Sequence, residues 1–306
     1  MKTNEIPSTP PTPRAGSGVF LVPFGKRLFL FACVTVVFFI IGAVIVGLIA
    51  SKGTTPSLRV ATIMQDIMLF IAPAIVTACF ITRMPARFLL LDRRPSAVLA
   101  LLGVAALFAS VPAMNALVAW NEGLSLPESL RPLEEAMKQS EEAARAMVDM
   151  LIGDRHSIGS LVMALLIVGV MAGFSEEIYF RGTLQRLLST GSVNPHVAVW
   201  VTAFIFSAVH MQFYGFFPRL LLGAFFGYMA WWAGSVWIPM IVHTVNNMTV
   251  VAGEFASPGF GVGFDTVGTE PTSGSVVLVA ASVVLTALLL WGFKKYSDRE
   301  NGSVVS

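Results

Sequence analysis

Long apolar runs alternate with short polar segments along most of this chain. An α-helix rises 1.5 Å per residue, so about 20 apolar residues reach across the roughly 30 Å hydrocarbon core of a bilayer. The runs predict about eight membrane-crossing helices, some of them short, and therefore an all-α, polytopic membrane helix bundle. We expect these helices at about 28–50, 58–81, 96–117, 158–174, 197–212, 220–233, 236–252 and 276–293.

Polar segments divide the chain further. Residues 1–25 are rich in Pro, Thr and Ser and predict a disordered tail, without the small-residue cleavage site of a signal peptide. A membrane domain over 26–296 and a C-terminal tail over 297–306 follow. Ala, Glu, Met and Leu at near-helical spacing over residues 127–151 predict an amphipathic helix outside the membrane core. The glycine-rich residues 257–275 predict a loop before the last helix.

The composition agrees with a membrane protein. Hydrophobic residues make up 55% of the 306 residues and charged residues 12%, which is too apolar for a water-soluble domain. The net charge of +2, without a basic helix face, argues against nucleic-acid binding. Cys33 and Cys79 lie within apolar runs, and we interpret them as small buried hydrophobic residues rather than a disulfide or metal pair.

Basic residues beside the apolar runs predict the orientation in the membrane, because Lys and Arg gather in cytoplasmic loops. With an even number of crossings, both termini are then cytoplasmic and the acidic residues 127–151 lie on the other side. The basic residues that carry this prediction are Arg14, Lys26, Arg27, Arg83, Arg87, Arg93, Arg94, Lys294 and Lys295.

Three short stretches bring ionisable side chains into or next to apolar runs, where such side chains are costly and usually functional. The first is SEEIYFR, in which Glu177 and Arg181 are four residues apart with the acid first, the order that favours a helical ion pair. Glu176 is rotated by about 100° on the same helix and is free to face another partner. The structural alternative is a helix end whose charges reach toward water.

The second and third stretches are FSAVH and HTVNN. FSAVH places Phe206 and His210 on one helical face, and HTVNN places His243 and Asn247 on another, with Asn246 beside them. Taken singly, each is also typical of a buried histidine or of hydrogen bonds between helices. Taken together they indicate chemistry, because two of the chain's four histidines lie in separate apolar runs downstream of the Glu-Glu pair.

In this order the stretches match EExxxR, FxxxH and HxxxN, and over about residues 158–252 the chain resembles the CAAX-protease and bacteriocin-processing family of intramembrane proteases. The resemblance implies an endopeptidase. It implies that Glu176 is the general base for a water that His210 binds and activates, and that His243 and Asn247 stabilise the oxyanion. Supporting roles, holding the site in shape or gripping the substrate, fall to Glu177, Arg181 and Phe206.

The resemblance outlines the substrate and the location. Eukaryotic relatives act on prenylated C-termini, whereas a membrane-anchored peptide or a bacteriocin precursor fits this chain equally well. We therefore expect a membrane-embedded or lipidated peptide as substrate, the lipid bilayer as a partner, and no nucleic acid. We expect the protein in a bacterial cytoplasmic membrane.

The requirement for a metal stays open. Four side chains have the chemistry to bind zinc, namely Glu176, Glu177, His210 and His243, but the HExxH motif of many zinc proteases is absent. Either a divalent metal such as zinc activates the water, or a glutamate does so without a metal. We favour the second mechanism, because an oxyanion role for His243 and Asn247 leaves few ligands.

Two other functions remain compatible with the sequence. A proton-coupled transporter would use Asp66, Glu176, His210 and His243 as a relay, although the two halves of the chain show no self-similarity. A non-catalytic membrane scaffold or immunity protein would keep the same residues for folding. For Asp66 we expect a polar partner on another helix rather than a catalytic role.

Overall fold

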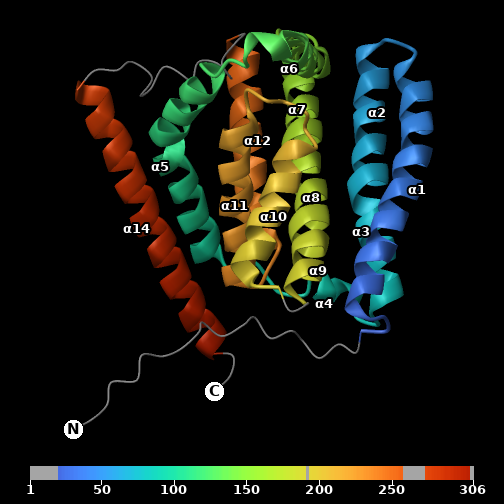
Figure 1. The fold of residues 1–306 in the computed structure, drawn as a ribbon, viewed down its shortest axis with the longest axis vertical. Coiled ribbons are helices and arrows are strands. Elements are labelled where there is room, and N and C mark those ends of the chain that lie inside the picture. Colours follow the sequence, from blue (N-terminus) through green and yellow to red (C-terminus); the bar gives the residue numbers. More distant parts are fainter. Residues whose placement is uncertain (1–19, 191–192, 258–272, 304–306) are drawn as a thin grey trace.

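The computed structural model describes residues 20–190, 193–257 and 273–303, and the regular elements in these residues are all helices. Its apolar helices run alternately up and down a single bundle (Figure 1), which confirms the predicted all-α membrane fold. The eight apolar segments are α1 (Phe24–Ala50), α2–η1–α3 (Thr55–Asp66, Ile67–Ile71, Ala72–Ile81), α5 (Ala97–Glu122), α7–η3–α8–η4–α9 (Ile158–Ala164, Leu165–Met171, Ala172–Glu177, Ile178–Leu184, Gln185–Ser189), α10 (Pro195–Ala208), α11 (Phe216–Ala233), α12 (Trp237–Ala256) and α14 (Ser273–Ser303).

The remaining helices are short or lie across one end of the bundle. α4 (Pro85–Phe88) connects α3 to α5, and η2 (Glu128–Leu130) leads into α6 (Arg131–Ile152). α6 lies at the end of the bundle opposite the end of α14 (Figure 1). Its buried residues, Leu151 and Ile152, are at its C-terminal end. The amphipathic helix predicted over residues 127–151 is therefore present, with most of its length exposed.

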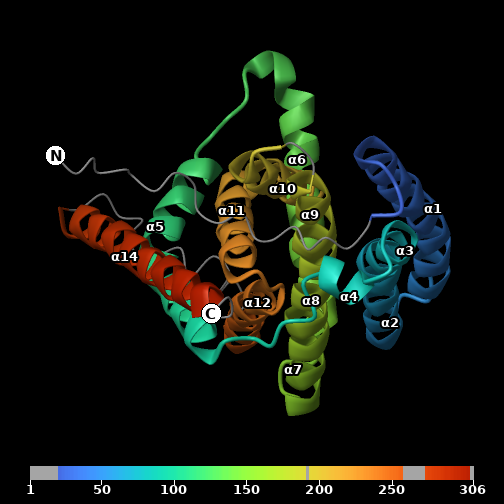
Figure 2. The same ribbon diagram turned by 90° about the horizontal axis from the view of Figure 1, so that it is seen from below.

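Among the described residues, five segments are long and apolar enough to cross a membrane by length and composition, namely α1, α2–α3, α5, α7–α9 and α14. α10 is a shorter apolar helix. α11 and α12 reach 18 and 20 residues and lie between α5 and the α7–α9 segment (Figures 1 and 2). Both contain polar residues within their apolar runs, such as Arg219 in α11 and His243 in α12, which is why hydropathy alone singles out fewer segments than the predicted eight.

The α7–α9 segment is one long helix with two π-helical stretches. The stretches η3 and η4 flank α8, and η4 contains Arg181. A π stretch adds a residue to the helical turn, shifts the register of the side chains that follow, and is frequent at functional sites. Glu176 and Glu177 lie between the two stretches, at the end of α8.

Two glycines let α11 approach its neighbours closely. A Cβ atom on Gly223 would lie 3.1 Å from the Cα of Ala203 in α10, and one on Gly227 would lie 2.8 Å from Gln185 Oε1 in α9. The carbonyls of these glycines are also accessible to side chains, because Arg181 Nη2 donates to Gly223 O at 2.8 Å and Gln185 Nε2 to Gly227 O at 2.9 Å. The glycines thus bind α11 to η4 and α9 through backbone groups.

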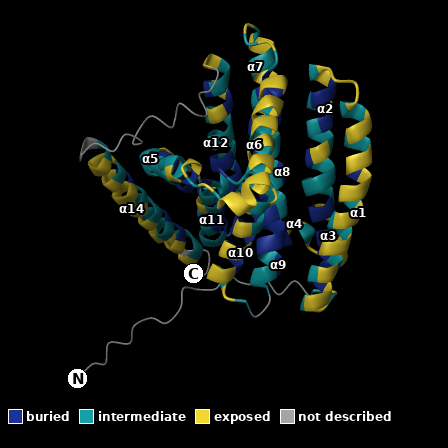
Figure 3. Ribbon diagram, turned by 45° about the horizontal axis from the view of Figure 1, so that its top comes forward, coloured by how far each residue is buried: buried dark blue, intermediate teal, exposed yellow. Residues whose placement is uncertain are grey.

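The prediction that Cys33 and Cys79 are buried is wrong. Both are exposed, on α1 and α3. Exposed residues are prominent along the outer helices α1 and α14 (Figure 3). In a membrane this outer surface faces lipid, which is as apolar as a protein interior and accepts a thiol equally well.

The predicted tails differ from the structure at both ends. The start of the chain, residues 1–19, and the loop residues 258–272 lie outside the described residues. Within the predicted N-terminal tail, Phe20 forms a β-bridge with Thr82 just before α1 begins. At the other end, α14 continues to Ser303, past the predicted boundary at 296, and Ser297 Oγ and Asn301 Nδ2 tie this part to α11 by donating to the Trp232 carbonyl.

Candidate active site

The three sequence motifs meet at one cavity in the bundle. Its volume is about 280 Å³. SEEIYFR contributes Glu176 from α8, FSAVH contributes Phe206 from α10 and His210 from the turn after it, and HTVNN contributes from α12. Eleven residues line the cavity: Glu176, Phe206, His210, Gly215, Pro218, Arg219, Leu222, Phe226, His243, Asn246 and Asn247.

A fully buried ion pair lies behind the cavity. The side chains of Glu177 and Arg181 are both 0% exposed. Arg181 Nη1 donates to Glu177 Oε1, and Nη2 donates to the Gly223 carbonyl. The guanidinium carbon also lies 4.6 Å from the centre of the Phe206 ring. The predicted helical ion pair is therefore present, and it joins η4 to α10 and α11.

His243 connects this ion pair to the cavity. Its Nδ1 lies 2.8 Å from Glu177 Oε1, and its ring stacks on Phe226 at a centroid distance of 4.7 Å. Glu177 Oε1 also accepts a hydrogen bond from Arg181. A carboxylate oxygen only accepts, so His243 Nδ1 is the donor and carries the proton. His243 Nε2 then faces Glu176, whose Oε2 lies 3.9 Å away.

His210 lies in the turn after α10 and is oriented by the backbone of that helix. Its Nδ1 lies 2.7 Å from the Phe206 carbonyl oxygen. A carbonyl only accepts hydrogen bonds, so Nδ1 is the donor, and Nε2 of the neutral ring keeps a lone pair. The His210 and Phe206 rings lie edge to face at 5.1 Å. This arrangement leaves Nε2 free to accept a hydrogen bond from a water molecule.

Asn246 and Asn247 extend the polar wall of the cavity along α12. Asn246 Nδ2 donates to Asn247 Oδ1 at 3.1 Å, and Asn247 Nδ2 donates to the Val168 carbonyl at 3.4 Å. Val168 lies in η3. An amide has two N–H donors, so Asn247 retains one for a group in the cavity.

Asp66 lies in the N-terminal half of the chain, outside the residues that line the cavity. It is buried at the end of α2, and its carboxylate interacts electrostatically with Glu176 on α8. Its Oδ2 is buried without a hydrogen-bond partner among the described residues. The polar partner that we expected on another helix is therefore not found for Oδ2 among the described residues, and the charged group near Asp66 is a second acid.

The arrangement does not fit a metal ion. In the described part of the chain, no three His, Cys, Asp or Glu side chains are grouped so that they could hold one. Glu177 Oε1 already accepts from Arg181 and His243. The four residues that could bind zinc by their chemistry are therefore close together without forming a ligand set.

Two of the cavity residues that the sequence did not single out contact or neighbour the catalytic groups. Phe226 stacks on His243, and Arg219 lies at the start of α11. Arg219 stands inside an apolar run, so the cost of a charge among apolar residues would have identified it. No local pattern identifies Phe226, because its stacking partner His243 is 17 positions away in the chain and lies on another helix.

These features define a class of protein: an integral membrane helix bundle with a carboxylate, two imidazoles and amides around one internal cavity. Residues 158–249, a little under a third of the chain, match the family described as type II CAAX prenyl endopeptidase, Rce1-like. The match confirms the family resemblance over this segment and supports an endopeptidase activity in the membrane. No curated protein and no solved structure matches the chain.

We predict that Arg181→Met destabilises the protein by about 3–5 kcal/mol, because it leaves the buried Glu177 carboxylate without its cation. Thermal unfolding of the detergent-purified protein measures this change. Arg131→Met, at a side chain that is 69% exposed, is the control and should melt like the wild type. Glu177→Gln/Arg181→Met should regain part of the loss, and a double variant no more stable than the single one would contradict the prediction.

Proposed function

We propose that this protein is an intramembrane endopeptidase that hydrolyses a peptide bond of a membrane-associated substrate with a water activated by Glu176 and His210. The observation that carries the proposal is that Glu176, His210 and His243, from three helical segments, line one cavity. The segment that contains them is the one that matches the Rce1-like family.

Glu176 and His210 would share the activation of the water. His210 Nε2 accepts one hydrogen bond from the water and positions it. Glu176 takes a proton as the water oxygen bonds to the carbonyl carbon of the substrate, and this proton then passes to the amine nitrogen when the carbon–nitrogen bond breaks. The Glu176 side chain is 13% exposed, so few other water molecules compete with the reacting water for its carboxylate.

His243 and Asn247 would stabilise the negative charge that develops on the substrate carbonyl oxygen. When His243 carries both ring protons, Nε2–H is a donor toward the cavity while Nδ1–H stays bonded to Glu177. The free N–H of Asn247 is the second donor. Fixed donors that point to a developing oxyanion typically lower the barrier by about 3–4 kcal/mol each.

Glu177 and Arg181 would act by positioning rather than by touching the substrate. Both side chains are fully buried. Glu177 fixes the tautomer and the ring orientation of His243, and Arg181 neutralises Glu177 and holds the α11 backbone. Such support is what keeps catalytic groups at productive distances.

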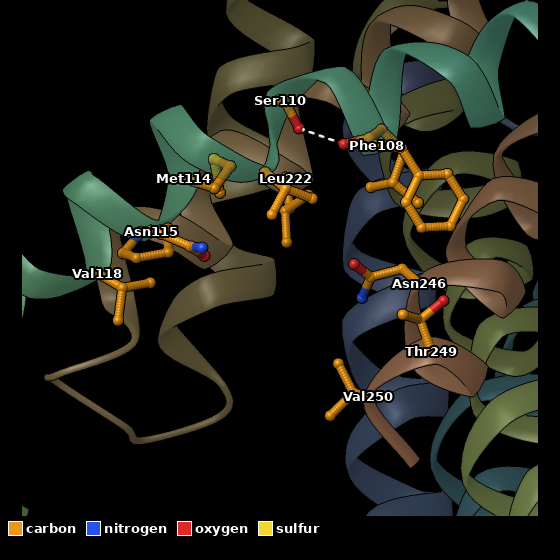
Figure 4. Close-up of a pocket in the computed structure, with 12 residues that line it drawn as sticks. Phe108, Ser110, Met114, Asn115, Val118, Leu222, Asn246, Thr249 and Val250 are labelled. Atoms are coloured by element: carbon orange, nitrogen blue, oxygen red, sulfur yellow. Dashed lines mark hydrogen bonds between the residues drawn. The ribbon is translucent and has the colours of Figure 1, made fainter. Parts of the chain in front are cut away.

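An apolar groove next to the site supports a membrane-anchored or lipidated substrate. It lies between α5, α11 and α12 and has a volume of about 210 Å³ (Figure 4). Pro218, Leu222 and Asn246 line both this groove and the catalytic cavity. We propose that an apolar part of the substrate occupies the groove while the adjoining peptide bond reaches Glu176.

The bend of α5 shapes this groove. Pro112 lies inside α5, and the hydroxyl of Ser282 in α14 accepts from Ala113 N and donates to the Ala109 carbonyl, at 3.3 Å and 2.6 Å. A proline removes one backbone donor and bends the helix, and a side chain from a neighbouring helix satisfies the freed groups. Phe108, Met114 and the residues around the bend face the groove (Figure 4).

We further propose that both termini lie in the cytoplasm. The start of α1 and the ends of α3 and α14 lie at the same end of the bundle, and α6 lies at the other (Figure 1). This gathers the basic flanks of these helices at one end, which supports the orientation expected from the positive-inside rule.

We predict that Glu176→Gln and His210→Ala each lower the rate of peptide hydrolysis by roughly 100- to 10,000-fold without loss of folding, because each removes a proton-transfer or water-binding group. Cleavage of quenched-fluorescence peptides by the detergent-purified protein measures the rate. Glu142→Gln, at an exposed position of α6, is the matched control. Full activity in Glu176→Gln would refute the mechanism.

We predict that zinc chelation leaves the rate of hydrolysis unchanged, because the side chains around Glu176 do not form a ligand set. The same peptide assay with and without a chelator measures this. Loss of activity that returns on addition of zinc would assign the water activation to a metal instead.

We predict that Met114→Trp lowers kcat/KM for a lipidated peptide by about tenfold or more, because the larger side chain fills the groove. The unlipidated form of the same peptide should be cleaved at the wild-type rate. Leu101→Trp, at a 71% exposed position of the same helix, is the control. An equal loss for both peptides would show that the substitution disturbs the site and that the groove does not bind the lipid.

A further inference from the structure

Arg219 is a cation inside the catalytic cavity that the proposed mechanism does not use. It lies in the first turn of α11 and lines the cavity together with Glu176 and His210. Its neighbours in the chain are the apolar residues of the run FFPRLLL. A charge at such a position is costly and is usually retained for binding or catalysis.

The guanidinium of Arg219 has few bonds within the described residues. Nη2 donates to Gln212 Oε1 at 2.5 Å, whereas Nη1 is buried and has no hydrogen-bond partner. Glu141 on α6 and Glu176 interact with Arg219 electrostatically, but neither bonds to Nη1. An unbonded donor on a charged, largely buried group is unfavourable until a ligand satisfies it.

The segment around Arg219 is held firmly in relation to His210. Asn121 at the end of α5 donates to the Phe213 carbonyl at 3.2 Å and accepts from Phe217 N at 3.1 Å. Ser207 Oγ donates to the Phe216 carbonyl at 2.7 Å. A group bound by Arg219 would therefore lie at a fixed distance from the water held by His210.

We propose that Arg219 binds a carboxylate of the substrate peptide and so selects a scissile bond at a short, fixed distance from that carboxylate. This inference rests on the proposed endopeptidase function. A guanidinium can bind a carboxylate with two parallel N–H donors from two of its nitrogens, and the unbonded Nη1 supplies one of them, whereas lysine does not reproduce this geometry. The carboxylate is that of the peptide's C-terminus or of an acidic side chain.

The first test measures binding, which does not depend on cleavage. The probe is the tripeptide Ala-Val-Leu as the free acid and as the C-terminal amide, with binding followed by the shift in thermal unfolding of the detergent-purified protein. The wild type should bind the acid about tenfold or more tightly than the amide, as expected for a charge-assisted hydrogen bond. Arg219→Gln should lose this preference, Arg219→Lys should retain part of it, and Arg131→Gln on α6 should keep it.

Equal binding of acid and amide by the wild type, or an unchanged preference in Arg219→Gln, would overturn the inference. Glu141→Gln separates the proposed role from an ion pair within the protein. If Arg219 serves only to balance Glu141, then Glu141→Gln and Arg219→Gln will change thermal stability alike and neither will alter the preference for the acid.

The second test measures cleavage and identifies the source of the carboxylate. Three forms of one fluorescent peptide are compared: the C-terminal acid, the C-terminal amide, and the amide with a glutamate near the scissile bond. If the first form is preferred, the bound carboxylate is that of the C-terminus. If the first and third forms are cleaved equally, Arg219 binds either carboxylate. If cleavage depends on Glu176 but not on any carboxylate, the protein is a protease and the proposed role of Arg219 is refuted. If the acid binds through Arg219 but no peptide is cleaved, the carboxylate site is supported and the proposed protease function is refuted.

Discussion

The buried ion pair of Glu177 and Arg181 is the interaction on which the rest of the site depends. One carboxylate oxygen of Glu177 accepts from both Arg181 and His243, so the two helices that carry the motifs SEEIYFR and HTVNN share a single acceptor. Arg181 also donates to the Gly223 carbonyl. Removal of one partner would leave a charge in a dry environment, so the pair constrains the surrounding packing more than it adds net stability.

Close backbone contact is the second requirement for this geometry. Gly223 and Gly227 bring α11 against α10 and α9, and the glycine carbonyls become acceptors for Arg181 and Gln185. Helices in a membrane gain little from hydrophobic burial against one another, so packing of small residues and hydrogen bonds between helices supply the association. The site is therefore built from the same contacts that hold the central helices together.

Two adjoining cavities place a polar and an apolar compartment side by side. The polar cavity around Glu176 adjoins an apolar groove through Pro218, Leu222 and Asn246, and Arg219 lies in the polar part. The substrate that we propose has an apolar segment for the groove and a polar scissile region for the cavity. The bend of α5 at Pro112, supported by Ser282, gives the groove its wall.

The sequence by itself determined the membrane helices, the helical ion pair and the three motifs, because hydropathy and the spacing of four residues are local properties. Only the tertiary structure decided which partners meet: Phe226 on His243, Asp66 near Glu176, and Arg219 in the cavity. It also decided that the cysteines are exposed, since a helix that is apolar on every side does not indicate which face packs against protein. Contacts between distant helices depend on close packing in three dimensions, which no short stretch of sequence specifies.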